Sequence, residues 1–230
     1  MKVGFIGDSL TEGRPGVSFV NMLKGQYPNI SLVNLGKPGE SVKSLHARLM
    51  KTTLDTDYDL SFLWIGVNDV YSKLLKVKAQ PIAANHEEFW ELFNNVLKLV
   101  SASSKQVVAV SPALVGETWN DSNKELKALS SIIQLATNKY PNVHFLNMQS
   151  VFEQRLSTLD SKDYISIRVF TVMKDVLFYK NPIRIDKLSK KRGLHLTLDG
   201  IHLNSYGAKV VAEEYASMME QLLYNNNVVQ

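Results

Sequence analysis

A serine at the end of the first apolar run has the position of a catalytic nucleophile. Residues 2–6 have the composition of a short buried strand, and the chain then turns through Gly7-Asp8-Ser9 toward a segment with helical spacing. The end of a strand just before a helix is where an α/β sheet presents a reactive group. A hydroxyl is a weak nucleophile, so Ser9 would need a base, an orienting acid and an oxyanion site. By itself, the motif equally fits a turn serine that caps the next helix.

The segment Asp199-Gly200-Ile201-His202 could supply the base and the acid. A histidine acts as a base when a carboxylate accepts a hydrogen bond from its other ring nitrogen and fixes its tautomer. Asp199 lies three residues before His202, and Gly200 permits a tight turn that brings the two side chains together. The alternative is a solvated histidine near the start of the last helix.

Two further segments could donate hydrogen bonds to an oxyanion. Residues 66–69 (Gly-Val-Asn-Asp) end a buried strand, and Asn68 could donate from its side-chain amide into a cleft. Gly39 precedes a predicted helix start and leaves its N–H unobstructed. Both segments also fit simple turns.

The remaining histidines do not indicate a metal site. None of them has the H-E-x-x-H or H-x-H spacing of zinc ligands, and the chain has no cysteine. We therefore expect neither a metal nor a disulfide. These histidines are His46, His86, His144 and His195.

The elements that must position these residues alternate along the chain. Strands are predicted at 2–6, 30–35, 59–66, 106–111 and 143–148, and helices at 17–26, from Ser41 to Leu49, 85–102, 121–139 and 204–223. This alternation is typical of βαβ units, which form a mostly parallel sheet covered by helices on both faces. In such sheets ligands bind beyond the carboxyl ends of the strands, where Ser9, Gly39 and Asn68 are expected to lie.

Residues 156–196 depart from this alternation. A helical stripe is predicted over 164–177, ended by Asn181-Pro182, and Lys187 to Arg192 is a basic, exposed-looking stretch. The segment is either a helix packed on the body of a single domain (1–230) or a lid or wall of the substrate site.

Composition sets further bounds. The 230 residues are 45% hydrophobic and 21% charged, with a formal net charge of +4, which is ordinary for a globular protein. No basic motif for nucleic acid is present, and no apolar run reaches the roughly 18 residues that span a bilayer. The sequence shows no signal peptide, so we expect a cytoplasmic protein without a membrane span or a nucleic-acid partner. Its oligomeric state is not predicted.

Together, four segments resemble the blocks of the SGNH (GDSL) hydrolase family of lipases and esterases. Residues 7–13 (Gly-Asp-Ser-Leu-Thr-Glu-Gly) resemble its first block, and Gly39 matches the glycine of the second. Residues 66–69 match the G-x-N-D block and residues 199–202 the D-x-x-H block. Each motif is short, but four in the same order along nearly the whole chain are jointly specific.

The resemblance implies a flavodoxin-like three-layer α/β/α sandwich with a five-stranded, mostly parallel sheet. It also implies that Ser9 is the nucleophile, His202 the general base and Asp199 its orienting acid. The oxyanion hole would consist of the Ser9 and Gly39 backbone N–H groups and the Asn68 side chain, and no cofactor is required.

The expected activity is that of a serine esterase that hydrolyses small carboxylic esters through an acyl-enzyme on Ser9. Short-chain acyl esters, O-acetyl sugars and lysophospholipids are all possible substrate classes. Asp8 and Trp119, the latter in a loop at a strand end, are expected to contact the substrate. The alternatives are acyl transfer to a sugar or alcohol by the same triad and, as a third, a non-catalytic binding module.

Overall fold

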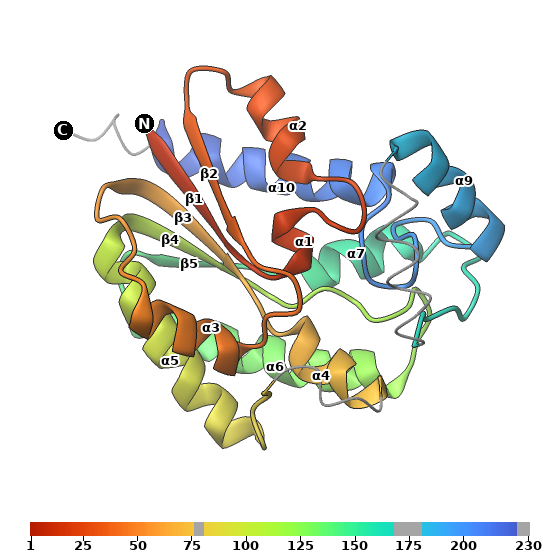
Figure 1. The fold of residues 1–230 in the computed structure, drawn as a ribbon, viewed down its shortest axis with the longest axis horizontal. Helices are drawn as coiled ribbons and strands as arrows, with labels where there is room; N and C mark the ends of the chain where they lie inside the picture. The colour runs from red at the N-terminus through yellow and green to blue at the C-terminus, as the bar shows by residue number, and fades with distance from the viewer. Residues whose placement is uncertain (76–80, 168–180, 225–230) are drawn as a thin grey trace.

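Five strands form one sheet in which each neighbouring pair is parallel (Figure 1). The computed structural model describes residues 1–75, 81–167 and 181–224. The strands are β1 (Lys2–Gly7), β2 (Ser31–Gly36), β3 (Tyr58–Trp64), β4 (Ser104–Val110) and β5 (Val143–Leu146), in the spatial order β2-β1-β3-β4-β5. This confirms the predicted five-stranded sheet and its flavodoxin-like strand order.

The strand order creates a crevice beside the end of β1. The chain leaves β1 toward β2 on one side of the sheet and then crosses to β3 on the other, so the direction of winding reverses there. Such a switch point is where open α/β sheets bind ligands. The strand ends are level, because Gly7 is paired with Gly36 on β2 and with Trp64 on β3. Segments that follow β1, β2 and β3 therefore meet at one edge.

Helices cover both faces of the sheet, which confirms the three-layer sandwich. In Figure 1, α2 and α10 lie on one face, and α3, α5 and α6 lie on the other. The helices are α1 (Ser9–Glu12), α2 (Phe19–Gln26), α3 (Val42–Lys51), α4 (Val67–Leu74), α5 (His86–Ser103), α6 (Asp121–Thr137), α7 (Met148–Leu156), α9 (Pro182–Arg192) and α10 (Ser205–Leu223). Within the described ranges, none of them is long and apolar enough to cross a membrane.

An aromatic cluster fixes α10 on the strands that lead into the switch point. Tyr215 of α10 is fully buried and stacks on Phe62 of β3, with ring centroids 4.2 Å apart. Phe5 of β1 stacks on both rings, and Phe19 of α2 packs edge-on against Tyr215. Aromatic pairs in these geometries add about 0.5–1.5 kcal/mol beyond the area they bury. The cluster therefore fixes the middle of the last helix against β1 and β3.

Polar side chains set where the helices begin. Ser41 caps α3 as predicted, and its hydroxyl accepts the backbone N–H of Ser44. Asn204 caps α10 by accepting the N–H of Gly207. Each cap satisfies a backbone donor that has no partner within its helix. The Asn204 cap starts α10 directly after the 199–202 segment.

The structure adds short helices to the sequence-based prediction. Asn68 and Asp69 lie in the first helical turn of α4 and not in a loop. The helix α1 begins directly at Ser9. A four-residue helix such as α1 is too short to show an apolar period, and in α4 the buried polar residues Asn68 and Asp69 interrupt the apolar pattern that predicts a helix.

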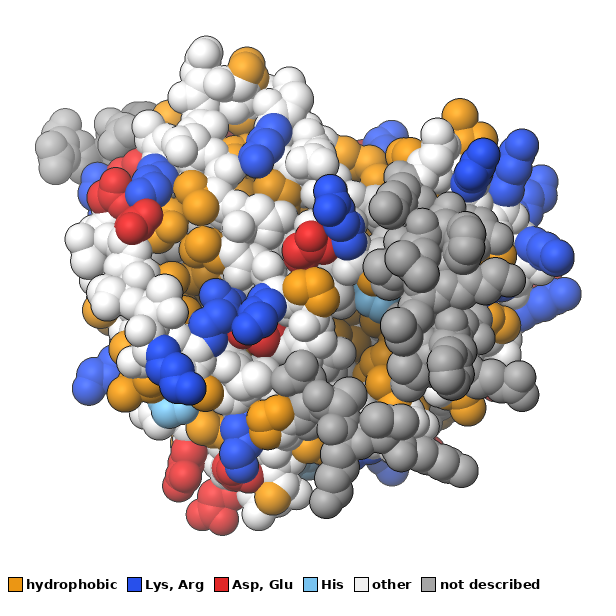
Figure 2. Space-filling model, viewed as in Figure 1, with side chains coloured by type: hydrophobic (Ala, Val, Ile, Leu, Met, Phe, Trp, Pro, Cys, Tyr) orange, Lys and Arg blue, Asp and Glu red, His pale blue; other side chains and the backbone are white. Residues whose placement is uncertain are grey.

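The 156–196 segment contains one described helix, α9, at a different place from the predicted one. Residues 161–167 form neither helix nor strand, and the remainder of the predicted stripe, 168–177, lies outside the described residues. The basic stretch Lys187–Arg192 is exposed in part, as expected, but it is the second half of α9. Figure 2 shows Lys and Arg side chains along the edge of the molecule that α9 forms.

Replacing either of two helical glycines by alanine should change stability, in opposite directions. A methyl group on Gly207 would lie 2.0 Å from the Leu196 carbonyl oxygen, whereas one on Gly25 would meet nothing within 4 Å. We expect Gly25→Ala to raise the free energy of unfolding by about 0.5–1 kcal/mol and Gly207→Ala to lower it by about 1–3 kcal/mol. Urea unfolding measures both. A Gly207→Ala variant as stable as Gly25→Ala would show that α10 does not need this close approach.

Candidate active site

Ser9, His202 and Asp199 form one continuous hydrogen-bonded chain. The Ser9 hydroxyl oxygen lies 3.0 Å from His202 Nε2, and His202 Nδ1 lies 2.7 Å from Asp199 Oδ2. Ser9 starts α1 directly after β1, whereas the other two residues lie in the loop before α10. Three side chains that the sequence predicts to act together are therefore in contact, across 193 positions of the chain.

The Asp199 carboxylate is fully buried and hydrogen-bonded on both oxygens. Oδ1 accepts the backbone N–H groups of Ile201 and His202, at 3.0 and 2.8 Å, and Oδ2 faces the His202 ring. Burial alone raises the pKa of Asp199, but the charge and hydrogen bonds of His202 outweigh it, so the pKa lies below its usual value. An ionised Asp199 favours the tautomer with the proton on Nδ1, in which the lone pair of Nε2 faces the Ser9 hydroxyl.

A tight turn holds Asp199 and His202 in this arrangement. The backbone N–H of Leu198 donates to the His202 carbonyl at 2.8 Å, and Thr197 is paired with Leu203 in a short bridge. Gly200 at the tip has a φ of +92°, a conformation that glycine adopts without the strain a side chain would cause. The loop is tied to the first segment of the chain by the N–H of Val17, which donates to the Leu203 carbonyl at 2.9 Å.

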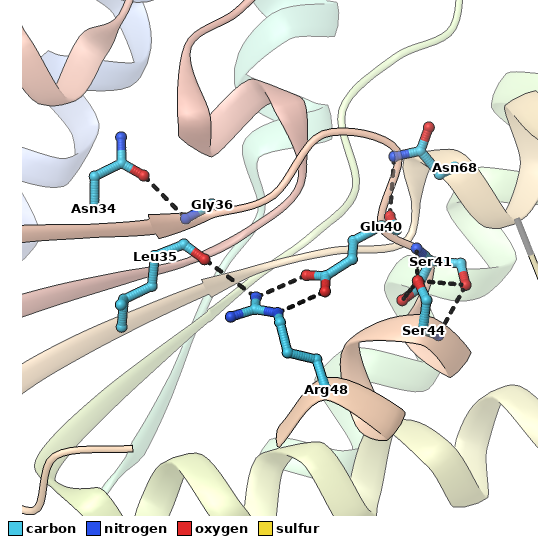
Figure 3. A network of polar contacts seen from close by, with 8 residues as sticks. All are labelled: Asn34, Leu35, Gly36, Glu40, Ser41, Ser44, Arg48 and Asn68. Atoms are coloured by element: carbon cyan, nitrogen blue, oxygen red, sulfur yellow. Dashed lines mark hydrogen bonds and ion pairs between the residues drawn. The ribbon is translucent and has the colours of Figure 1, made fainter. Parts of the chain in front are cut away.

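The three predicted oxyanion donors gather at the same edge. Ser9 follows β1, Gly39 lies in the turn after β2, and Asn68 lies in the first turn of α4 after β3. Asn68 Nδ2 donates to the Glu40 carbonyl at 2.9 Å and to Asp8 Oδ2 at 3.2 Å. The side chain of Asn68 thus links the turns after β1 and β2, and Figure 3 shows its bond to the Glu40 carbonyl.

A buried ion pair supports the turn that carries Gly39. The Glu40 carboxylate accepts two hydrogen bonds from Arg48 of α3, at 2.6 and 2.7 Å, and Arg48 also donates to the Leu35 carbonyl at 3.1 Å. Figure 3 shows the Arg48 guanidinium between β2 and the turn. The two-bond geometry restricts both side chains and therefore fixes the turn from Gly36 to Glu40. Sequence reasoning missed this pair, since the two residues share no recognisable motif.

The family comparison agrees with this geometry. A model described as GDSL-like Lipase/Acylhydrolase matches residues 3–215. The chain belongs to this family. It is therefore an ester-hydrolysing enzyme, as the predicted resemblance to GDSL hydrolases implied.

Solved structures similar to this GDSL-like acylhydrolase share its fold at low sequence identity. LAE5, an alpha/beta hydrolase enzyme from the metagenome of Lake Arreo, has a TM-score of 0.67 at 18% identity, covering 96% of this chain and 95% of its own. An acetylxylan esterase from Geobacillus stearothermophilus (TM-score 0.66, 18% identity) covers 96% and 93%. The acetyl xylan esterase AlAXEase (TM-score 0.66, 21% identity) covers 95% and 99%. A search of curated protein sequences finds no match.

Asp8 of this acylhydrolase is buried beside Ser9 and contacts other residues of the candidate site. Its Oδ1 accepts the Leu10 N–H at 2.9 Å and caps α1, while Oδ2 accepts from Asn68. Burial raises the pKa of Asp8 to about 7, against the effect of the Leu10 hydrogen bond and the charge of His202. With 1% of its surface exposed, Asp8 supports the nucleophile turn and Asn68, and the structure gives it no open face toward a substrate.

Asp69, the neighbour of Asn68, organises the start of α3. Its Oδ2 accepts the Val42 N–H at 2.9 Å, and its Oδ1 lies 3.5 Å from the Ala83 N–H. Burial raises the pKa of Asp69 to about 6. The second acid of the Asn-Asp pair is thus a structural group that connects α4 with α3.

Trp119 lies apart from the triad. Its side chain is 74% exposed and lines a cavity of about 320 Å³ with residues that include Leu114, Thr118 and Leu156, but none of the triad. A substrate contact by Trp119 stays a prediction. Among residues 1–75, 81–167 and 181–224, no group of three or more acidic or histidine side chains could hold a metal ion.

Because Asp8 is buried, the free energy of unfolding should depend on pH. In the folded protein its pKa of about 7 lies above the usual 3.8, so between these values the folded state holds a proton that the unfolded chain has released. Stability therefore falls as the pH rises through this window. We expect wild type to lose roughly 2–3 kcal/mol more than Asp8→Asn between pH 5 and pH 8, measured by urea unfolding.

The comparison uses the pH dependence and not the absolute stability, because the Asp8→Asn substitution would place an amide against the Asn68 amide. Asp69 is present in both proteins, so its own titration cancels in the difference. Equal loss of stability in the two proteins would show that Asp8 does not titrate in this range.

Proposed function

We propose that this GDSL-like acylhydrolase is a serine esterase that hydrolyses carboxylic esters through an acyl-enzyme on Ser9. The observation that carries the proposal is the hydrogen-bonded chain from Ser9 Oγ through His202 to the buried Asp199 carboxylate. His202 Nε2 takes the hydroxyl proton as Oγ attacks the carbonyl carbon, and returns it to the departing alkoxide. Water then gives a proton to His202 as its oxygen attacks the acyl carbon, and His202 returns that proton to Ser9 Oγ as the acyl–oxygen bond breaks, which releases the acid and restores Ser9.

In this mechanism the oxyanion forms opposite the Ser9 N–H, the Gly39 N–H and the Asn68 amide. Asn68 Nδ2 has two hydrogens, and its bond to Asp8 is longer than its bond to the Glu40 carbonyl (3.2 against 2.9 Å). We expect the oxyanion to replace Asp8 as acceptor, while the Glu40 carbonyl keeps the amide in place. The Glu40 bond thus holds the amide in advance, and the oxyanion takes the place of one acceptor without moving Asn68.

The substrate class that we propose is a small acyl ester, with O-acetyl groups of sugars as the first candidates. The support is the similarity of fold to acetylxylan esterases. The esterase from G. stearothermophilus is represented by catalytic mutants of one serine, one aspartate and one histidine, the last two three positions apart. Asp199 and His202 have the same spacing. A screen of p-nitrophenyl esters of increasing acyl length, acetylated xylo-oligosaccharides and lysophospholipids tests the class, and hydrolysis of the lysophospholipids alone would contradict it.

Removing the nucleophile or the base is expected to abolish turnover. Ser9→Ala and His202→Ala should each lower kcat for p-nitrophenyl acetate by at least about 1000-fold, and Ser9→Ala should not react with a fluorophosphonate probe. Ser131→Ala is the matched control, because Ser131 is an exposed serine of α6 that bonds only to the Lys127 carbonyl. Labelling of Ser9→Ala, or unchanged turnover in either triad variant, would rule out the mechanism.

The Asn68→Ala substitution tests the side-chain amide as an oxyanion donor. Because the amide acts on charge that develops in the transition state, we expect kcat to fall by about 100- to 1000-fold and KM to change little. The assay is steady-state hydrolysis of p-nitrophenyl acetate, with the unfolding midpoint measured in parallel because Asn68 also bonds to the Glu40 carbonyl. A rise in KM at constant kcat would instead assign Asn68 to ground-state binding.

A further inference from the structure

Glu117, in the loop between β4 and α6, has a buried carboxylate that accepts five hydrogen bonds. Oε1 accepts the backbone N–H groups of Leu196 and Thr197, both at 2.8 Å, and the Thr197 hydroxyl at 2.7 Å. Oε2 accepts the His195 N–H at 2.7 Å and the Ser161 hydroxyl at 3.3 Å. Only 6% of the Glu117 surface is exposed. One side chain thus gathers three consecutive backbone donors from a segment almost 80 positions away.

These contacts continue into the loop that holds the acid and the base. Thr197 Oγ1, which donates to Glu117, also accepts the Gly200 N–H at 3.2 Å. The neighbour of Glu117, Gly116, donates its N–H to the Gly200 carbonyl at 2.6 Å. Both polar backbone groups of Gly200 are therefore held by the β4–α6 loop, one directly and one through Thr197. Gly200 is the residue that follows Asp199.

The carbonyl groups of the same loop have separate partners. Ser189 Oγ of α9 donates to the Thr197 carbonyl at 2.6 Å, Arg192 to the Leu198 carbonyl at 2.7 Å, and the Ser166 N–H to the Asp199 carbonyl at 2.9 Å. Loss of any one of these donors leaves the others in place. The N–H groups of 195–197, in contrast, all depend on Glu117.

A carboxylate is the side chain that suits this position. It accepts hydrogen bonds at both oxygens and donates none, which matches five donors. A glutamine would direct an NH₂ group against N–H donors on one side and leave buried donors without partners. Unpaired buried donors are costly enough to move the backbone.

We propose that Glu117 is a positioning residue of the esterase, whose carboxylate fixes the path of residues 195–200 and so the orientation of Asp199 toward His202. This inference rests on the proposed triad. The hydrogen bonds of Glu117 go to Ser161 and to residues 195–197, so its effect on the reaction passes through Thr197 and Gly200. The Glu117 carboxylate thus binds residues 195–197 of its own chain.

Glu117→Gln and Thr197→Val test the proposal by steady-state kinetics of p-nitrophenyl acetate across pH. Displacement of the Asp199 carboxylate by a fraction of an ångström should lower kcat by about 10- to 100-fold with KM nearly unchanged. A less well aligned Asp199 stabilises the His202 imidazolium less, so the acid limb of kcat/KM should move to lower pH. Thr197→Ser, which restores the hydroxyl, should recover most of kcat.

Asp59→Asn is the matched control. Asp59 is also a carboxylate that accepts two hydrogen bonds, from the Lys2 N–H at 2.8 Å and from Lys105 Nζ at 2.7 Å, but at the amino end of the sheet. Its substitution should affect stability while leaving kcat and the acid limb unchanged. Wild-type kcat and an unmoved acid limb in folded Glu117→Gln would overturn the proposal. If Glu117→Gln does not fold, wild-type kinetics of Thr197→Val would do the same.

A readout without turnover separates this inference from the proposed function. His202 Nδ1 lies 2.7 Å from Asp199 Oδ2. The proton between these two atoms should give a far-downfield NMR signal that is absent in Asp199→Asn. In Glu117→Gln and Thr197→Val we expect that signal to move upfield, whatever the substrate. An unmoved signal overturns the role of Glu117, whereas a moved signal in a protein without esterase activity would contradict only the proposed function.

Discussion

The Asp199 carboxylate is removed completely from water, and this constraint shapes the surrounding site. A buried charge must be compensated locally, and here the compensation comes from two backbone N–H groups on one oxygen and the His202 ring on the other. Under the proposed mechanism, these same bonds select the His202 tautomer that can accept a proton from Ser9. The group that is most costly to bury is then also the group that orients the base.

Positioning a histidine against a serine from the far end of the chain requires a rigid frame. The level ends of β1, β2 and β3 provide one side of that frame, and the stacking of Tyr215 on Phe62 provides the other by seating α10. The loop between them is short and hydrogen-bonded along its length. The precision of the site thus depends on side chains that never contact a substrate, including the Arg48–Glu40 pair under the Gly39 turn.

Sequence reasoning reached the sheet and the triad because both leave local signals. Alternating apolar segments predict the strands, and Gly-Asp-Ser and Asp-x-x-His are short motifs at predictable strand ends. It did not reach α4, because Gly66 and the polar pair that follows it have the composition of a turn. It also missed Glu40 and Glu117, whose partners are set by tertiary packing and not by spacing. A carboxylate that binds backbone N–H groups has no partner residue type that a sequence could reveal.

The separation of Ser9 and His202 by 193 positions has a consequence for biosynthesis. A ribosome releases Ser9 long before His202, and contacts between such distant segments form slowly. No nascent chain that lacks the last helix and its preceding loop can hold an activated serine. Under the proposed mechanism, Ser9 therefore stays unactivated until the 199–202 loop has been synthesised and has packed beside the end of β1, and esterase activity reports that this contact has formed.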